Sequence, residues 1–372
     1  MRNKLKIENN KLARTTKLLI SLCCAAFGLL IAVSCVKDTS VYDDKEIRFG
    51  ISNAKSRALI TDLTNLESQE IGVYGYYTAT ERWRWSAHNV APNLSANYFF
   101  NKKLEYNTTK SEWGYGTPKY WPPDTINKIS FFAYSPYVDV PSTDPLRPYP
   151  HTKTDAGSPY LFYEVPTDVT DQVDLIWDSK IDMSHAHAPV VFDMKHALTR
   201  ISFTAAIAAS EYGKTYQATI TEISLSGVHG TGDLDLFDGT WIPYTIPPAL
   251  KADYLLSIAG ADLIGYDFKT FAISTDYIPR PLIDNDHYLM LIPQDITDDA
   301  VLNFTLDIVF PLVSPTPVTT AMAVPLRPII NKWEAGQAIV FNLSIKGEFI
   351  AVTTSLTPWV TAGTDSTGDV DF

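Results

Sequence analysis

The sequence predicts an all-β protein built from antiparallel β-sandwiches, and three observations favour this fold class. Apolar and polar residues alternate with a period of two in many short stretches, as in half-buried strands. Outside the N-terminal segment, no stretch keeps the apolar spacing of an amphipathic helix over three turns. Aromatic residues are frequent (20 Tyr, 17 Phe, 8 Trp), and 24 prolines are scattered along the chain. A length of 372 residues is enough for two such domains in tandem.

The N-terminal segment predicts export. A basic stretch ending at Lys17 precedes an uninterrupted apolar run from Leu18 to Val33, and the small residue Ser34 follows. This order is that of a bacterial secretory signal. A membrane-spanning helix needs roughly 20 apolar residues, and the run is shorter, so it suits export better than permanent spanning.

The end of this signal, Ala32-Val33-Ser34-Cys35, resembles the lipobox of bacterial lipoproteins. The resemblance implies that residues 1–34 are removed and that a lipid is attached to the Cys35 thiol. A plain secretion signal or an uncleaved anchor is the alternative. All three cysteines lie at or before Cys35, so the exported body has no disulfide and no thiol ligand or nucleophile.

The first folded element is expected at Lys45 to Ser52, after a polar, acidic tether. In this stretch Ile47, Phe49 and Ile51 lie on one side of a strand. The next residues, 53–58, are small and polar and predict an exposed loop that contains Lys55 and Arg57. We therefore treat residues 35–57 as a tether and first strand that could be a propeptide.

Residues 58–189 are predicted to form an N-terminal β-sandwich. The long stretch from Val138 to Ser158 is rich in proline and reads as a loop. Strands are expected at Glu70–Thr78, at Leu104–Tyr106, at Lys128–Tyr134, at Leu161–Val165 and at Asp174–Trp177.

Residues 190–372 are predicted to form a C-terminal β-sandwich, with the boundary placed just before Val190. A strand pair is expected within Val190–Ile207, and Lys346-Gly347 is expected to turn a hairpin into Glu348–Thr354. The other expected strands are Ala218–Ser226, Gly232–Phe237, Phe268–Ile273, Tyr288–Ile292, Asn303–Phe310, Ala321–Leu326 and Ala338–Lys346.

Charge and motif content exclude several function classes. The formal net charge of −12 disfavours binding to a phosphate backbone. Nucleophile-elbow, phosphate-loop and dinucleotide motifs are absent from the sequence. Asp233 and Asp235 share one face of a strand but lack the spacing of a calcium loop. The sequence thus predicts no catalytic residue and no cofactor.

Two small groups of side chains are candidate binding sites. His185, His187, Asp182 and His196 lie close in sequence, but no fixed-spacing motif completes a metal site, so we expect loop histidines and no metal. Trp83 and Trp85 alternate with two arginines. They could form an exposed platform that stacks on sugar rings, although tryptophan in sandwiches is more often part of the core.

Arg57 has a structural and a functional interpretation. It fits equally well as an ordinary surface arginine and as a protease site, because exposed loop tips are where chains are cut. Cutting after Arg57 would detach the first strand from the rest of the chain. An open position in a sheet would then accept a strand from another chain.

Several short motifs, in this order, resemble the fimbrillin family of surface lipoproteins in Bacteroides-type bacteria. They are the lipobox at Cys35, the EIRFGIS strand followed by Ser56-Arg57-Ala58, Tyr120-Trp121-Pro122, Phe132–Pro136, Lys195–Ile201 and Thr357-Pro358-Trp359. The resemblance implies two tandem transthyretin-like β-sandwich domains and cleavage of the Arg57–Ala58 bond. It further implies that Glu46–Ser52 is released and that a strand from within Ala338–Phe372 of another subunit fills the groove.

The sequence therefore favours a structural, tip or accessory subunit of a surface fimbria, anchored in the outer membrane through its lipid. Its partners would be other fimbrial subunits and, for an adhesin, a host protein or glycan, but not nucleic acid. The alternative is a monomeric, lipid-anchored glycan-binding protein that uses Trp83 or Trp85.

Overall fold

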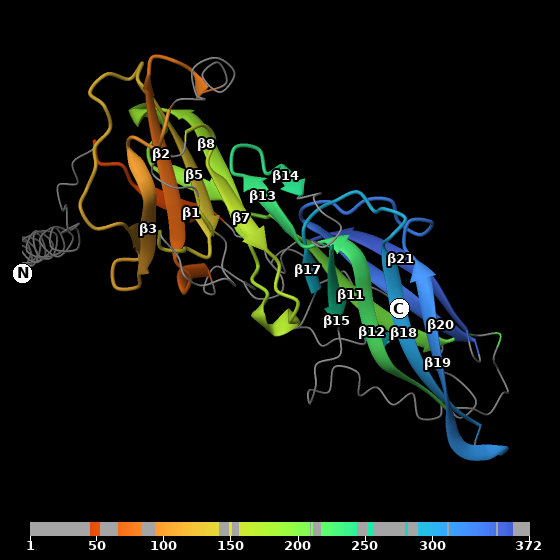
Figure 1. Cartoon of the computed structure of the whole chain (residues 1–372). Coiled ribbons are helices and arrows are strands. Elements are labelled where there is room, and N and C mark those ends of the chain that lie inside the picture. Colours follow the sequence, from red (N-terminus) through yellow and green to blue (C-terminus); the bar gives the residue numbers. More distant parts are fainter. Residues whose placement is uncertain are drawn as a thin grey trace, which may run out of the picture. The chain divides into compact units, whose positions relative to one another are not determined.

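The fold is seen in a computed structural model of the chain (Figure 1). It describes residues 45–52, 66–83, 94–140, 149–150, 156–208, 210, 217–243, 251–255, 280–281, 289–310, 312–346 and 349–359. Contacts divide the chain into Met1–Glu46 and Ile47–Phe372. Everything described below concerns the second of these units.

The regular structure of the described residues is β-strand, with two short 3-10 helices at Val169–Asp171 and His185–His187. The predicted all-β fold class is therefore confirmed. No helix within these residues is long and apolar enough to cross a bilayer. The expected strand Phe268–Ile273 and the residues Cys35, Arg57, Ala58 and Trp85 lie outside the described part.

The largest sheet contains the N-terminal strands. Its two ends, β9 and β10, are consecutive in the chain, and the Asp193 amide donates a hydrogen bond to Oδ2 of Asp178 on β8 (2.7 Å). The sheet thus curls until its ends meet. In order, its strands are β10 (Lys195–His196), β8 (Ile176–Met183), β5 (Lys128–Ser135), β2 (Ile71–Ala79), β3 (Phe99–Asn107), β4 (Glu112–Gly114), β1 (Phe49–Ser52) and β9 (Val190–Asp193).

A four-stranded sheet combines strands from both halves of the sequence. Strand β7 pairs antiparallel with β13, from Tyr160↔Asp235 to Glu164↔Thr231. The order is β14 (Trp241–Pro243), β13 (Thr231–Asp235), β7 (Tyr160–Glu164) and β6 (Tyr149–Pro150). Pairing thus crosses residue 190 here and again at β9 and β10. The division into two tandem domains at that residue stays a prediction.

The C-terminal strands form two further sheets that share one core. Phe304, Leu306 and Ile308 on β18 and Ile339, Phe341, Leu343 and Ile345 on β20 are buried there, as their alternation predicts. One sheet has the order β16 (Arg280–Pro281), β11 (Thr199–Ile207), β20 (Gln337–Lys346) and β21 (Phe349–Pro358), with β17 (Leu289–Leu291) also paired to β11. The other has the order β15 (Lys251–Leu255), β12 (Gln217–His229), β18 (Val301–Phe310) and β19 (Ser314–Pro325).

Two strand pairs are parallel, which the expectation of antiparallel sheets did not include. They are β1 with β9, and β11 with β20, where the register runs from Arg200↔Ala338 to Ile207↔Ile345. Parallel neighbours need long connections, and both pairs join segments that are far apart in the sequence. Alternation within a single strand carries no information on such distant partners.

Candidate functional site: the slot of the first strand

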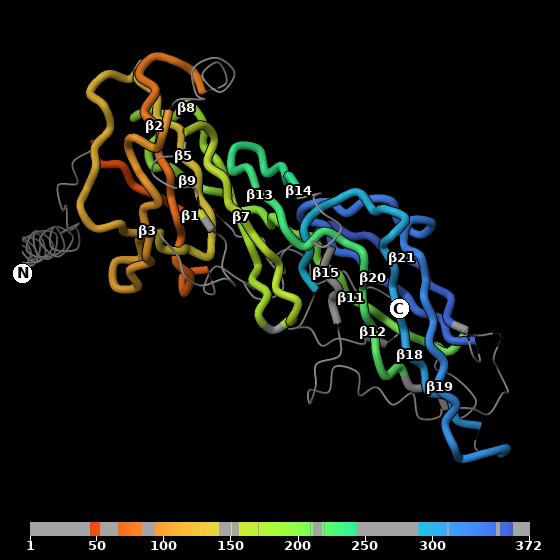
Figure 2. Tube along the Cα trace, viewed as in Figure 1, coloured from red at the N-terminus to blue at the C-terminus, as the bar shows by residue number. Residues whose placement is uncertain are grey.

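Strand β1 is an inner strand, although it is only four residues long. On one side it pairs antiparallel with β4 at Phe49↔Trp113. On the other side it pairs parallel with β9 along its whole length, from Phe49↔Val190 to Ser52↔Asp193 (Figure 2). We call the space between β4 and β9 the first-strand slot.

The residues just before β1 are also held by hydrogen bonds from distant parts of the chain. The amide of Ile47 donates to the Lys119 carbonyl (2.8 Å), and the Tyr115 hydroxyl donates to the Ile47 carbonyl (2.7 Å). The Val190 amide donates to the Arg48 carbonyl (2.9 Å). The expected strand Lys45–Ser52 is therefore shorter as a ladder, because Ile47 is bonded to a loop instead of a strand. Removing this segment would leave donors and acceptors without partners on both sides of the slot.

Phe49 is the central side chain of the slot. Its ring lies 5.5–5.8 Å, between centroids, from the rings of Phe99, Tyr115, Phe131 and Phe192. Three of the four contacts are edge-to-face, a favourable geometry for aromatic pairs. Phe49 is 5% exposed. The slot is thus lined by aromatic rings that come from four separate segments.

The other inward residues of this segment follow the predicted alternation. Ile47 is fully buried, and Ile51 is partly buried and packs against the same core. That core is separate from the larger one shared by the C-terminal sheets. Its other buried members are Leu66, Ile71, Val73, Leu104, Trp113, Trp121, Ile129, Ala133, Ile176, Val190 and Met194.

The loop that holds Ile47 is itself braced. The Lys119 ammonium donates to the Tyr98 carbonyl and lies 5.0 Å from the centroid of the Tyr98 ring. The Tyr98 hydroxyl donates to the Tyr120 carbonyl, and burial, with a smaller contribution from Tyr77, raises the pKa of Tyr98. A tyrosine hydroxyl is protonated at neutral pH in any case, and the raised pKa extends this donating form to higher pH. These contacts fix one wall of the slot independently of β1.

Trp83 does not form the exposed platform that the sequence allowed. Its side chain is fully buried and packs on Tyr76 and Phe132, with ring centroids 5.0 Å away in both pairs. Its backbone amide donates to Oδ1 of Asp182 (2.8 Å). The alternation with Arg82 left exposure open, and the burial that is commoner for tryptophan in sandwiches holds here, because the ring packs on the preceding strand and on a residue 49 positions further along the chain. The expectation for Trp85 lies outside the described residues.

The histidines that are candidate metal ligands make contacts within the protein. His187 Nδ1 lies 3.1 Å from the Ser184 amide and hydroxyl, and His196 Nδ1 lies 2.8 Å from Oδ1 of Asp174. Within the described ranges, no three His, Cys, Asp or Glu side chains are grouped so that they could hold a metal ion. Asp233 and Asp235 are half-buried on one face of β13, with Leu234 buried on the other, as expected.

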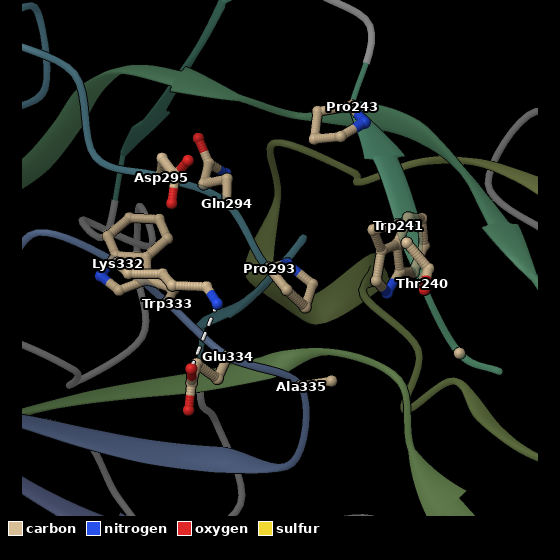
Figure 3. Close-up of a pocket in the computed structure, with 11 residues that line it drawn as sticks. Thr240, Trp241, Pro243, Pro293, Gln294, Asp295, Lys332, Trp333, Glu334 and Ala335 are labelled. Atoms are coloured by element: carbon tan, nitrogen blue, oxygen red, sulfur yellow. Dashed lines mark ion pairs between the residues drawn. The ribbon is translucent and has the colours of Figure 1, made fainter.

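A cavity of about 360 Å³ lies away from the slot, between β14 and the segments around residues 293–295 and 332–335 (Figure 3). Lys332 and Glu334 form an ion pair across 3.2 Å at its rim. The Trp241 indole N–H donates to the Ala197 carbonyl, and the Gln294 amide group bonds the backbone of His229. Trp241 and Gln294 thus use their polar groups within the protein, whereas the buried indole N–H of Trp333, which also lines the cavity, has no hydrogen-bond partner within the described residues.

The sequence of this chain is similar to those of known proteins. The family model described as fimbrillin-like matches residues 56–359. The chain belongs to the fimbrillin-like family. The fimbrium subunit Fim1C of Phocaeicola vulgatus is 27% identical over 160 residues, which is 41% of this chain and 40% of that protein. The match thus spans less than half of that relative.

Solved structures share the fold of this fimbrillin-like chain. A fimbrial protein from Bacteroides vulgatus superposes with a TM-score of 0.66 at 21% identity, covering 85% of this chain and 100% of that one. A protein described as a cell adhesion protein from Bacteroides uniformis superposes with a TM-score of 0.51 at 14% identity, covering 85% of this chain and 99% of that one. The predicted family resemblance is confirmed.

The sequence identified β1 but not the walls of its slot. The sequence predicts a strand pair that includes Val190 and Phe192 at the start of a second domain, and it predicts no strand at Tyr115 or Lys119. The frequent aromatic residues in 113–121 were the available signal, since such a cluster in a turn-rich region needs a core to cover it.

We expect Phe49→Ala to lower the free energy of unfolding by about 3–5 kcal/mol, because it removes a buried ring and leaves a cavity. The matched control is Val191→Ala on the adjacent strand β9, since Val191 is 38% exposed. The control should cost less than about 1 kcal/mol. Urea denaturation of the uncleaved protein measures both. If both variants lower the free energy of unfolding by the same small amount, the Phe49 ring does not stabilise the packing of β1 in the slot.

Proposed function

We propose that this fimbrillin-like protein is a structural, tip or accessory subunit of a surface fimbria that assembles by exchange of a β-strand. The observation that carries the proposal is that β1 fills an inner position of a sheet and is the first strand of the described residues. One cut in residues 53–65 would separate it covalently from the described strands that follow it. The slot would then present unpaired backbone groups beside an apolar, aromatic core.

The proposed cut is the Arg57–Ala58 bond, and the released segment is Glu46–Ser52. An open inner position is a strong acceptor, because an incoming strand gains main-chain hydrogen bonds on two sides and apolar pockets for alternate side chains. The pockets of Ile47 and Phe49 are fully or nearly fully closed to solvent while β1 is in place. A donor strand therefore needs branched or aromatic residues at alternate positions.

Within Ala338–Phe372, strand β21 suits this role better than β20. Strand β20 lies between β11 and β21 and is bonded on both sides, whereas β21 is an edge strand bonded to β20 alone (Figure 1). Ile350, Val352 and Leu356 lie on one face of β21, in register with the buried residues of β20. Strand β21 also carries no charged residue. Of the two described strands in this region, β21 would break fewer strand-pairing hydrogen bonds on leaving its sheet. Its apolar residues also alternate as a donor strand for the slot requires.

The other parts of the proposal follow from export. The protein would be lipidated at Cys35 and reach the outer membrane surface, and its partners would be other fimbrial subunits, with a host protein or glycan as a further partner of a tip adhesin. Its named relatives are fimbrial and adhesion proteins, not enzymes. The burial of Trp83 removes one of the two residues on which a glycan-binding monomer was argued.

Arg57→Ala should prevent assembly, because β1 would stay tethered and would refill its own slot at high effective concentration. Lys55→Ala is the matched control, since it removes a positive charge two positions away in the same segment. Wild type and Lys55→Ala should yield polymers with Ala58 as the N-terminus, measured by surface extraction, non-denaturing gels and N-terminal sequencing. Polymers of normal length from Arg57→Ala would refute cleavage-dependent assembly.

Cys35→Ser should abolish lipid attachment and shift the protein from the membrane fraction to the soluble fraction. Cys24→Ser, within the apolar run of the signal, is the control and should behave as wild type. Labelling with a palmitate analogue and fractionation of the cells give the readout. Continued labelling of Cys35→Ser would contradict the proposed attachment site.

A further inference from the structure

Two motifs that are far apart in the sequence meet in the structure. The His196 imidazole, at the end of β10, stacks on the Trp359 indole, which directly follows β21. The ring centroids are 3.7 Å apart and the planes differ by 7°. His196 is 6% exposed and Trp359 is 4% exposed. The stack therefore joins the end of the last strand to the large N-terminal sheet.

The imidazole side of this stack is fixed in place. Its Nδ1 lies 2.8 Å from Oδ1 of Asp174, whose side chain is also buried. The backbone of His196 is in register with Ile176 on β8. A ring held by both a side-chain contact and a strand ladder presents a rigid surface to Trp359.

The backbone of Trp359 is also connected, through Gly336, to the segment that contains His196. The Trp359 amide donates to the Gly336 carbonyl (2.6 Å), and the Gly336 amide donates to the Leu198 carbonyl (2.9 Å). Gly336 has a φ of +68°, a conformation that glycine adopts without strain. The residues just before β20 and just after β21 are thus both connected to the segment His196–Leu198.

The other described side chains of β21 are less buried than that of Trp359. Among the side chains described between 350 and 359, only Trp359 is buried. Leu356 is 51% exposed although it lies on the face of β21 that is in register with buried Ile339. Ile350 and Val352 are partly buried against the core, and Trp359 is the one buried anchor among these described side chains.

We propose that the stack of Trp359 on His196 is a latch that keeps β21 in its own sheet, and that opening the latch frees β21 to act as the donor strand. The second half rests on the proposed function, whereas the first half does not. A donor strand must leave its own sheet before it can enter a slot elsewhere. Trp359 and His196 are positioning residues in this scheme, and they set how often β21 is free.

The latch is tested by hydrogen exchange on the uncleaved, monomeric full chain. Trp359→Ala and His196→Ala should each raise the exchange rates of the β21 amides by about 100-fold, as expected when one side of a buried aromatic contact is lost. Trp359→Phe keeps a stacking ring and should restore most of the protection. Leu356→Ala, on the same strand but half-exposed, is the matched control and should change these rates by less than about fivefold.

The acceleration must be local to support the latch. Amides of β11 and β18 should exchange as in wild type. Unchanged exchange of the β21 amides in both alanine variants would overturn the latch, because the stack would then not hold β21. An equal rise of the exchange rates in β11 and β18 would also overturn it, because the stack would then contribute only to overall stability.

The donor role is read separately, from the rate of polymer formation after cleavage. Trp359→Ala and His196→Ala should assemble faster than wild type, while Leu356→Ala should not. If the variants expose β21 but assemble no faster, the link between latch and assembly is wrong and the latch alone stands. If wild type itself forms no polymer after cleavage, the proposed function fails and the exchange result is unaffected.

Discussion

The structure around β1 depends on one constraint: a strand inside a sheet must satisfy hydrogen bonds on both of its sides. Strand β1 does so with β4 and β9, and the residues before it do so with Tyr115 and Lys119. The segment from Ile47 to Ser52 is thereby held by two distant parts of the chain, residues 113–119 and strand β9. Removing such a segment costs free energy, and a strand with apolar side chains at alternate positions can then take its place.

The two ends of the folded chain have complementary properties. Strand β1 is short, buries Phe49 and is paired on both sides, so that its absence creates an acceptor. The C-terminal strand β21 is longer, uncharged and bonded on one side, with its firmest side-chain contact at Trp359. The latch and the slot therefore address the two steps of one exchange, the freeing of a donor and the opening of an acceptor.

Local alternation predicted which residues of a strand face inward, and it did so correctly for Phe49, for Phe304 and for Phe341. It could not predict strand partners, because the parallel pairing of β1 with β9 joins residues about 140 positions apart. Trp83 shows the same limit, since its burial depends on Phe132 and Asp182. The contact between His196 and Trp359 could not be predicted either, although both residues lie in short motifs of the family resemblance, since no local pattern relates these two segments.

The most direct test of strand replacement is the composition of native surface fibres. Digestion with chymotrypsin, which leaves arginine bonds intact, yields a peptide that spans Arg57 and Ala58 only if the chain was not cut. Mass spectrometry measures this peptide against one from β20. Strand replacement predicts that the spanning peptide and the Glu46–Ser52 segment are nearly absent from the fibres. Finding both in equal amounts with the β20 peptide would contradict it.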